Sequence, residues 1–198
     1  VDGLHNPEYV VQNLEGAKKF KDEFDPDFVK VMTDGLFFMP FNYEDVHCAS
    51  DLKNLKATDE MDLYFEKAVE FAKNTRAIYG DDVYMFYNVF SPCFQADYTE
   101  KIIDAVVGAG IADGIYFSVS CFNRGIEHDT YRTYVTPGEH RIIAKANSLQ
   151  EDNLLHICGW RGMRNDLSIF DDYDFSVINW AVHAEHVSVA EGKKMFKG

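Results

Sequence analysis

The chain alternates between two kinds of hydrophobic pattern, and this alternation restricts its fold more than any other feature of the sequence. Short, almost continuous apolar runs of strand length recur along the chain, and segments with helical spacing separate them. Strands that are apolar on both faces are typical of a parallel sheet covered by helices. The pattern therefore predicts an α/β protein with right-handed crossovers. We expect strands at 28–33, 83–89, 114–119, 154–158 and 175–180.

Capping and breaking residues mark where the helices begin and end. Asn6 precedes Pro7, a capping residue before the first helical position, and helical spacing continues to about Phe24. A second helix is expected to open at Thr58 and to stop at Gly80. Further helices are expected over 99–108, over 127–147 in two pieces divided near Pro137, and after a capping box that begins at Ser188.

Length and charge narrow the classes of function. The 198 residues carry 19 Lys and Arg against 33 Asp and Glu, a net charge of −14, and no basic stripe interrupts this balance. We therefore expect one domain over residues 1–198 with no affinity for nucleic acid. No apolar run approaches membrane-spanning length and no signal-type core opens the chain, so membrane insertion and secretion are not expected. Four dispersed cysteines indicate thiols in a reducing compartment, and we expect the cytoplasm.

Two α/β architectures fit the alternation, an open doubly wound sheet and a (β/α)8 TIM barrel. The glycine-rich phosphate loops GxGxxG and GxxxxGK[ST] do not occur, which disfavours the nucleotide-binding doubly wound type. A complete barrel has eight βα units and about 250 residues. The roughly five units that the alternation predicts here would therefore form an incomplete barrel. In a barrel, chemistry is carried by polar residues at the C-terminal strand ends. Here these are Asp34, Asn88, Ser118, Ser120, Cys121, His156, Cys158 and Asn179.

Four short motifs resemble those of one family. Residues 153–159, NLLHICG, look like the LHxCG fourth strand of the uroporphyrinogen decarboxylase superfamily. Residues 112–115 are similar to its third-strand entry, 131–137 to its F-x-x-F-V-x-P helix, and 177–180 to its apolar-apolar-Asp/Asn-Trp strand end. The resemblance implies a (β/α)8 barrel with its cleft at the C-terminal face of the strands. It also implies that parts are missing, since the family's later strands would follow Gly198.

His156 and Cys158 are one residue apart on a predicted strand, so their side chains point to the same face. An imidazole and a thiolate are two of the three protein ligands that a catalytic zinc uses. The methyltransferase branch of the superfamily resembles this pair and adds a distant Cys, which would lie beyond Gly198; Cys121 is a substitute third ligand. The alternative is that both residues are packed, hydrogen-bonded interior side chains.

Other residues resemble the site of the decarboxylase branch. Asp34, within Met-Thr-Asp-Gly, looks like the strand-end Asp that accepts hydrogen bonds from tetrapyrrole N–H groups. Tyr98 falls where that branch has its site tyrosine. For binding of a polyanionic substrate, Arg161 and Arg164 are candidate carboxylate clamps, and Asn179 is a candidate substrate-binding residue at its strand end.

The resemblance favours zinc-dependent methyl transfer from a corrinoid to a thiol. The first alternative is decarboxylation of uroporphyrinogen in porphyrin biosynthesis, which needs no cofactor. The second is a non-catalytic barrel that binds a corrinoid or a tetrapyrrole. Expected partners are a small-molecule or tetrapyrrole substrate and, for the first function, a corrinoid protein; an oligomer is compatible with all three.

Overall fold

The computed structural model describes residues 3–33, 36–45, 47, 51, 54–91, 96–120, 127–159 and 162–197. The chain forms two compact units, which we call the first unit (Val1–Asn88 and Lys101–Asp113) and the second unit (Val89–Glu100 and Gly114–Gly198). Parallel strands alternate with helices, so the predicted α/β class is confirmed. The barrel, and the single domain over residues 1–198, stay predictions.

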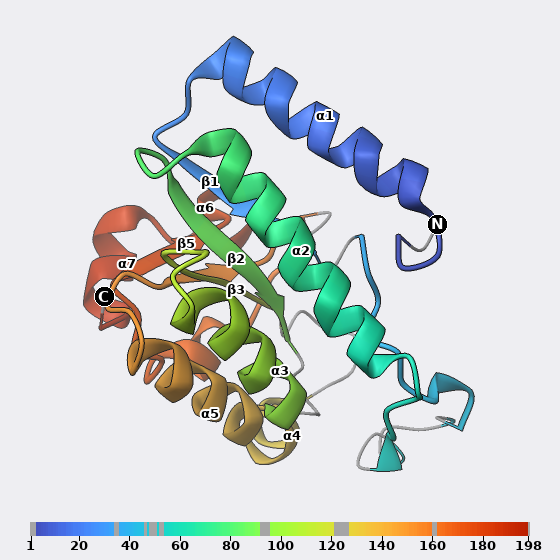
Figure 1. Cartoon of the computed structure of the whole chain (residues 1–198). Coiled ribbons are helices and arrows are strands. Elements are labelled where there is room, and N and C mark those ends of the chain that lie inside the picture. Colours follow the sequence, from blue (N-terminus) through green and yellow to red (C-terminus); the bar gives the residue numbers. More distant parts are fainter. Residues whose placement is uncertain are drawn as a thin grey trace. The chain divides into compact units, whose positions relative to one another are not determined.

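The first unit contains two long helices and a parallel strand pair (Figure 1). Its elements are α1 (Pro7–Phe24), β1 (Phe28–Val31), the 3-10 turn η1 (Tyr43–Asp45), α2 (Met61–Tyr79) and the first part of β2 (Tyr84–Phe90). Strand β1 pairs in parallel with β2, with Phe28 opposite Tyr84. Helix α1 runs alongside α2, where Lys21 Nζ donates to the Ile78 carbonyl at 2.6 Å and the Tyr79 hydroxyl donates to the Ala17 carbonyl at 3.1 Å. Polar bonds thus supplement the packing of α1, which buries none of its residues.

Helix α1 begins and ends where the sequence predicts. The side-chain oxygen of Asn6 accepts a hydrogen bond from the Tyr9 N–H at 3.2 Å, which satisfies one of the unpaired donors of the first turn. At the other end Asp25 adopts a left-handed conformation with φ 43°. Pro26 follows it and has no N–H to continue the helix. Local chemistry is therefore sufficient to set both ends of α1.

Two predicted helix starts are wrong by about one turn. Helix α2 begins at Met61, because the Thr58 hydroxyl accepts from the Glu60 N–H and forms a tight turn before the helix. Its predicted stop is confirmed, since Gly80 has φ 78°, a conformation that favours glycine. Helix α3 (Ala96–Ile103) begins before Thr99, whose side chain is buried within the helix and does not cap it. A π-helical turn, η3 (Asp104–Gly108), follows α3 directly.

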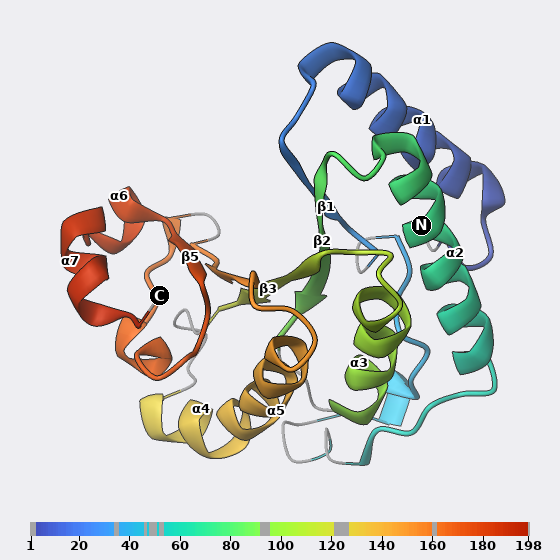
Figure 2. The same ribbon diagram turned by 60° about the vertical axis from the view of Figure 1, so that its left-hand side comes forward.

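The second unit contains three parallel strands in chain order (Figure 2). Its further elements are β3 (Gly114–Val119), α4 (His128–Tyr134), α5 (Thr136–Asn147), β4 (Leu154–Ile157), the 3-10 turn η5 (Leu167–Phe170), β5 (Val177–Trp180), α6 (Val182–Glu185) and α7 (Val189–Met195). Strand β4 lies between β3 and β5, with His156 opposite Ser118 on one side and Asn179 on the other. The predicted break near Pro137 and the Ser188 capping box are both confirmed.

Alternate residues of β4 have different surroundings. Leu155 and Ile157 are fully buried, and Phe117 on β3 is buried with them and stacks against Phe175 at 6.1 Å between ring centroids. His156, which points to the opposite face, is only half-buried. Leu154, two residues before His156 and therefore on the same face, is also buried, so this face becomes more accessible only toward the C-terminal end of β4, at His156 and Cys158.

A fully buried carboxylate joins several elements of the second unit. Glu139 on α5 accepts hydrogen bonds from the Tyr131 hydroxyl on α4 at 2.7 Å, from the Tyr173 hydroxyl after η5, and from the Ser91 hydroxyl after β2. Burial raises the pKa of Glu139 above its ordinary value of 4.5, while the three hydrogen bonds oppose this shift. The carboxyl group therefore serves as a common acceptor for three hydroxyls that lie far apart in the sequence.

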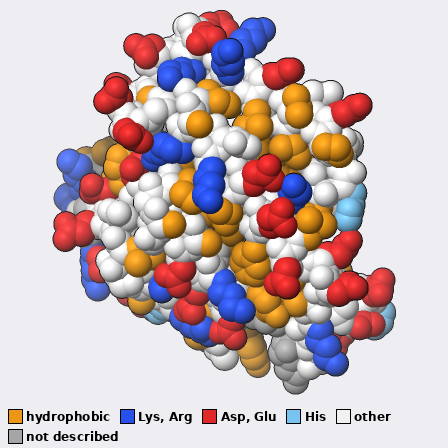
Figure 3. Space-filling model, in the orientation of Figure 1, with side chains coloured by type: hydrophobic (Ala, Val, Ile, Leu, Met, Phe, Trp, Pro, Cys, Tyr) orange, Lys and Arg blue, Asp and Glu red, His pale blue; other side chains and the backbone are white. Residues whose placement is uncertain are grey.

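None of the helices in the described part of the chain is both long and apolar enough to cross a membrane. On the face shown in Figure 3, Lys and Arg side chains are dispersed among Asp and Glu and form no continuous basic patch. This distribution agrees with the net charge of −14.

We predict that Glu139→Leu lowers the free energy of unfolding by about 2–4 kcal/mol, because it leaves buried hydroxyls without their acceptor. Glu139→Gln keeps an acceptor oxygen and a similar volume, and we expect it to cost less than half as much. Urea denaturation of the three proteins measures the difference. Equal losses in both variants would show that the hydrogen bonds are not what stabilises this region.

The raised pKa of Glu139 also predicts a pH dependence. Because this carboxyl binds its proton more tightly in the folded than in the unfolded protein, its contribution to stability falls as the pH rises from below 4.5 through the raised pKa. Glu139→Gln has no such proton, so the difference between the wild-type and the variant free energies of unfolding should shift against the wild type with rising pH. Denaturation curves between about pH 4 and 8 test the sign.

Candidate functional site

A hydrogen bond links two polar side chains on neighbouring strands of the second unit. The imidazole Nδ1 of His156 on β4 lies 2.6 Å from the amide Oδ1 of Asn179 on β5. The two residues are direct partners in the parallel register, so their side chains leave the sheet on the same face. His156 is half-buried and Asn179 is exposed. The sequence predicted that both residues stand near strand ends, and the structure brings them into contact.

Tyr116 on β3 lies on the other side of the same imidazole. Its ring centroid is 5.2 Å from that of His156, with the two rings tilted by 36°. Burial raises the pKa of Tyr116 above its ordinary value of 10.0, and the negative charge of an ionised Cys158 raises it further. Tyr116 therefore packs against His156. Because Cys158 follows His156 by two residues in an extended segment, the two predicted zinc donors share one face of the sheet, opposite to Leu155 and Ile157.

Hydrogen bonds fix the backbone of Cys158 on both sides. Its N–H donates to the Val119 carbonyl at 2.8 Å, which extends the pairing of β4 and β3 by one residue. Its carbonyl accepts from the Asn165 amide at 3.1 Å. Asn165 is held in turn by Glu185, which is 2% exposed and accepts from its side chain at 2.6 Å and from its backbone N–H at 2.9 Å. The thiol is therefore attached to a rigid backbone position.

The residue after Cys158 must be glycine for a packing reason. A Cβ placed on Gly159 would lie 2.6 Å from the Cβ of Ala181, closer than side-chain carbons approach in proteins. Ala181 directly follows β5 and precedes α6. The glycine of the HxCG motif thus allows the chain after β4 to approach the chain after β5.

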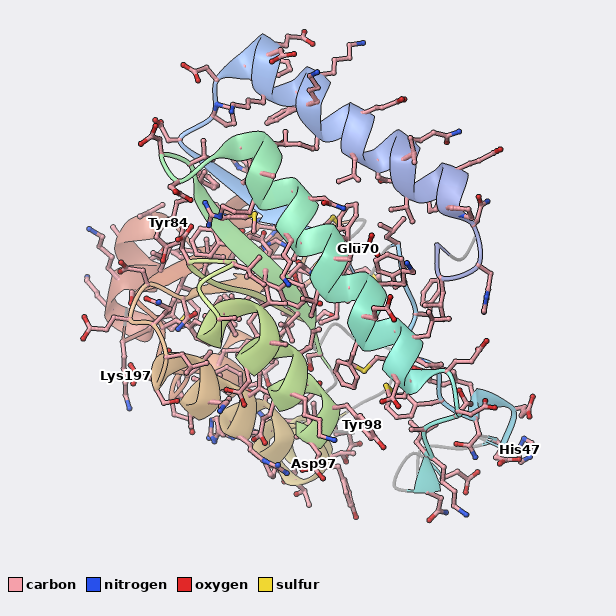
Figure 4. The ribbon with its side chains drawn as sticks, viewed as in Figure 1. His47, Glu70, Tyr84, Asp97, Tyr98 and Lys197 are labelled. Atoms are coloured by element: carbon pink, nitrogen blue, oxygen red, sulfur yellow. The ribbon has the colours of Figure 1, made fainter. Side chains whose placement is uncertain are left out.

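The remaining predicted site residues have varied positions. Asp34 and Arg161 lie outside the described residues. Tyr98 is in the first turn of α3, next to Asp97, and is half-buried (Figure 4). Arg164 is exposed and donates from its guanidinium to the carbonyl of Glu185, the last residue of α6, at 2.9 Å. One donor of this predicted carboxylate clamp is therefore already engaged within the protein.

The donor chemistry of His156 and Cys158 suits zinc. An imidazole nitrogen and a thiolate sulfur are typical zinc donors, and Cys158 is a free thiol. Within the described ranges, no three His, Cys, Asp or Glu side chains gather closely enough to hold a metal ion. Cys121, the substitute third ligand expected from the sequence, lies outside these ranges. His156 and Cys158 would thus hold a metal together with at least one further ligand.

Sequence reasoning missed two residues around this site. Tyr116 was not expected there, although its spacing of two from Ser118 places both on one face of β3. Asn165 lies in an irregular connection, and no periodic pattern marks its contact with Cys158. Tyr116 could have been found if the strand register had been known. The contact of Asn165 with Cys158 could be found only from the tertiary structure.

The comparisons with known proteins find no relative. No family model matches the chain, and neither a curated protein nor a solved structure is significantly similar to it.

We predict that Tyr116→Leu changes the NMR shift of the His156 Cε1–H group, because it removes the aromatic ring at 5.2 Å. Tyr116→Phe keeps the ring and should leave this resonance close to its wild-type position. His156→Gln assigns the signal in a ¹H–¹³C spectrum. Tyr134→Leu, which alters a 75% exposed ring on α4, is the control. An unchanged resonance in Tyr116→Leu would contradict the described contact.

Proposed function

We propose that this protein transfers a methyl group from a corrinoid to a thiol with the help of zinc, as a member of the uroporphyrinogen decarboxylase superfamily. In this proposal the parallel strands are part of a (β/α)8 barrel, and the site lies at the C-terminal ends of the strands. A corrinoid protein is the proposed methyl donor, a small thiol the acceptor, and the cytoplasm the proposed location.

One observation carries the proposal. His156 and Cys158 stand at the end of β4, on the more accessible side of the strand, with Tyr116 and Asn179 beside them. The alternative expectation, that both are ordinary interior residues, is less favoured because His156 and Cys158 are half-buried, whereas Leu154, Leu155 and Ile157 are buried. Two metal donors on one rigid strand need little ordering when they bind.

The chemistry of the proposed site can be assigned to its parts. A zinc ion held by His156 and Cys158 would lower the pKa of a substrate thiol and keep it as a nucleophilic thiolate. The Tyr116 hydroxyl keeps its proton at neutral pH, since burial raises its pKa further above the ordinary value of 10.0, and it is therefore a hydrogen-bond donor beside His156. Asn165 and Glu185 hold the backbone that presents the Cys158 thiol.

Decarboxylation of uroporphyrinogen is the second candidate. The observation that favours it is the position of Asp34, which follows three residues after the end of β1 in the segment Met-Thr-Asp-Gly. A fixed carboxylate in such a place would stabilise the positive charge that develops on a pyrrole ring as CO2 leaves. Tyr98, Arg161, Arg164 and Asn179 would then contact the substrate, and no cofactor would be needed.

We predict that the complete protein binds about one zinc per chain, and that His156→Ala or Cys158→Ser removes it. Elemental analysis after dialysis against a weak chelator measures the metal content. His5→Ala and Cys48→Ser, which change the same residue types elsewhere in the sequence, are the matched controls and should keep the metal. A methyl-transfer assay with methylcobalamin and a small thiol should lose activity in the same two site variants.

Two other results of these assays would favour one of the alternative functions. A zinc-free complete protein that releases CO2 from uroporphyrinogen, and loses this activity in Asp34→Asn, would replace methyl transfer by decarboxylation. A zinc-free protein without either activity would favour a barrel that binds a corrinoid or tetrapyrrole without turnover. Spectral titration with cobalamin and with a porphyrin tests that third function directly.

A further inference from the structure

We propose that Asn179 is a positioning residue that holds His156 in the tautomer with its proton on Nδ1 and so presents Nε2 as the donor nitrogen of the site. The metal-binding part of this inference rests on the proposed function, whereas the tautomer itself does not. The role is additional to the substrate binding that the sequence predicts for Asn179.

The direction of the hydrogen bond follows from the atoms involved. Asn179 presents its amide oxygen, Oδ1, to Nδ1 of His156 at 2.6 Å. An amide oxygen can only accept a hydrogen bond, so with Oδ1 facing the ring this contact is a hydrogen bond in the tautomer that carries its proton on Nδ1. In a neutral imidazole the lone pair is then on Nε2, the nitrogen that can bind a metal or accept a proton. Histidine ligands of metals are commonly oriented in this way by an acceptor on their other nitrogen.

The position of Asn179 is set by the sheet and not by a flexible loop. Asn179 and His156 are paired residues of the parallel strands β5 and β4, so the distance between their backbones is determined by the ladder. On the other side the Tyr116 ring packs against the imidazole at 5.2 Å. His156 is thus confined between a ring on β3 and an acceptor on β5. This arrangement limits the rotation of the imidazole and favours one tautomer.

Two substitutions of Asn179 distinguish its role as a hydrogen-bond acceptor from a role in packing. Asn179→Leu has a similar size but no acceptor, and Asn179→Asp restores an acceptor oxygen at the same place. Val177→Ala, two residues earlier on the same face of β5, is the matched control, because Val177 is exposed and paired with Leu154. Backbone amide spectra of all variants verify that the fold is kept.

Long-range ¹H–¹⁵N NMR of the metal-free complete protein, at a pH where His156 is neutral, reports which ring nitrogen carries the proton. We expect Nδ1–H in the wild type, in Asn179→Asp and in Val177→Ala, and a shift toward Nε2–H in Asn179→Leu. A zinc titration should then give about 10–100-fold weaker binding for Asn179→Leu than for the wild type, with recovery in Asn179→Asp.

The NMR measurement of the tautomer and the zinc titration test separate parts of the inference. A wild-type protein with its proton on Nε2, or an unchanged tautomer in Asn179→Leu, would overturn the inference about Asn179 whatever the metal content. The expected tautomers in a complete protein that binds no zinc would support the positioning by Asn179 and would remove the zinc-dependent function instead. Unchanged zinc affinity in Asn179→Leu despite a changed tautomer would overturn the metal-binding part.

Discussion

Strand β4 supplies both the hydrophobic core and the candidate site of the second unit, and the rest of that unit depends on how its residues alternate. Leu155 and Ile157 are fully buried, whereas His156 points to the opposite face. Because side chains in a strand have a period of two, a shift of one residue would turn the imidazole to the face that holds the core residues Leu155 and Ile157. Burial of two large aliphatic side chains is worth about 1.5–3 kcal/mol each, so the core itself enforces the orientation of His156. Pairing with β3 and β5 then brings Tyr116 and Asn179 to the same imidazole.

Two buried carboxylates organise the irregular parts around this strand framework. Glu139 accepts hydrogen bonds from Tyr131 and Tyr173, and Glu185 accepts them from Asn165. A buried carboxylate needs several donors to offset the loss of water, so each of these groups draws separate segments together. The loss of water around Glu139 raises its pKa. Hydrogen bonds from Asn165 to Glu185 and to the Cys158 carbonyl hold the connection after β4 close to Cys158.

The candidate site could be predicted in part from the sequence. The spacing of His156 and Cys158 placed both on one face of a strand, and the pattern around Asn179 placed it near the end of the next strand. Their relation could not be predicted, because it depends on the register between β4 and β5, which aligns His156 with Asn179. Asn179 is hydrogen-bonded to the imidazole and Arg164 donates to the carbonyl of Glu185, and these contacts also depend on the tertiary structure. That both residues bind substrate stays a prediction.

The sequence by itself determined the features that depend on neighbouring residues: the α/β alternation, the approximate strand positions, the Asn6 and Ser188 caps and the stop at Gly80. These signals are local, since they come from backbone propensity, from capping hydrogen bonds and from periodicity within one element. Short elements such as η5 and α6 gave no such signal, because four residues are too few to show a period. Only the tertiary structure decided the strand register, the burial of Glu139 and the contact of His156 with Tyr116 and Asn179. Each of these joins residues that are far apart in the chain, and their meeting is set by the packing of whole elements and not by any pattern within them.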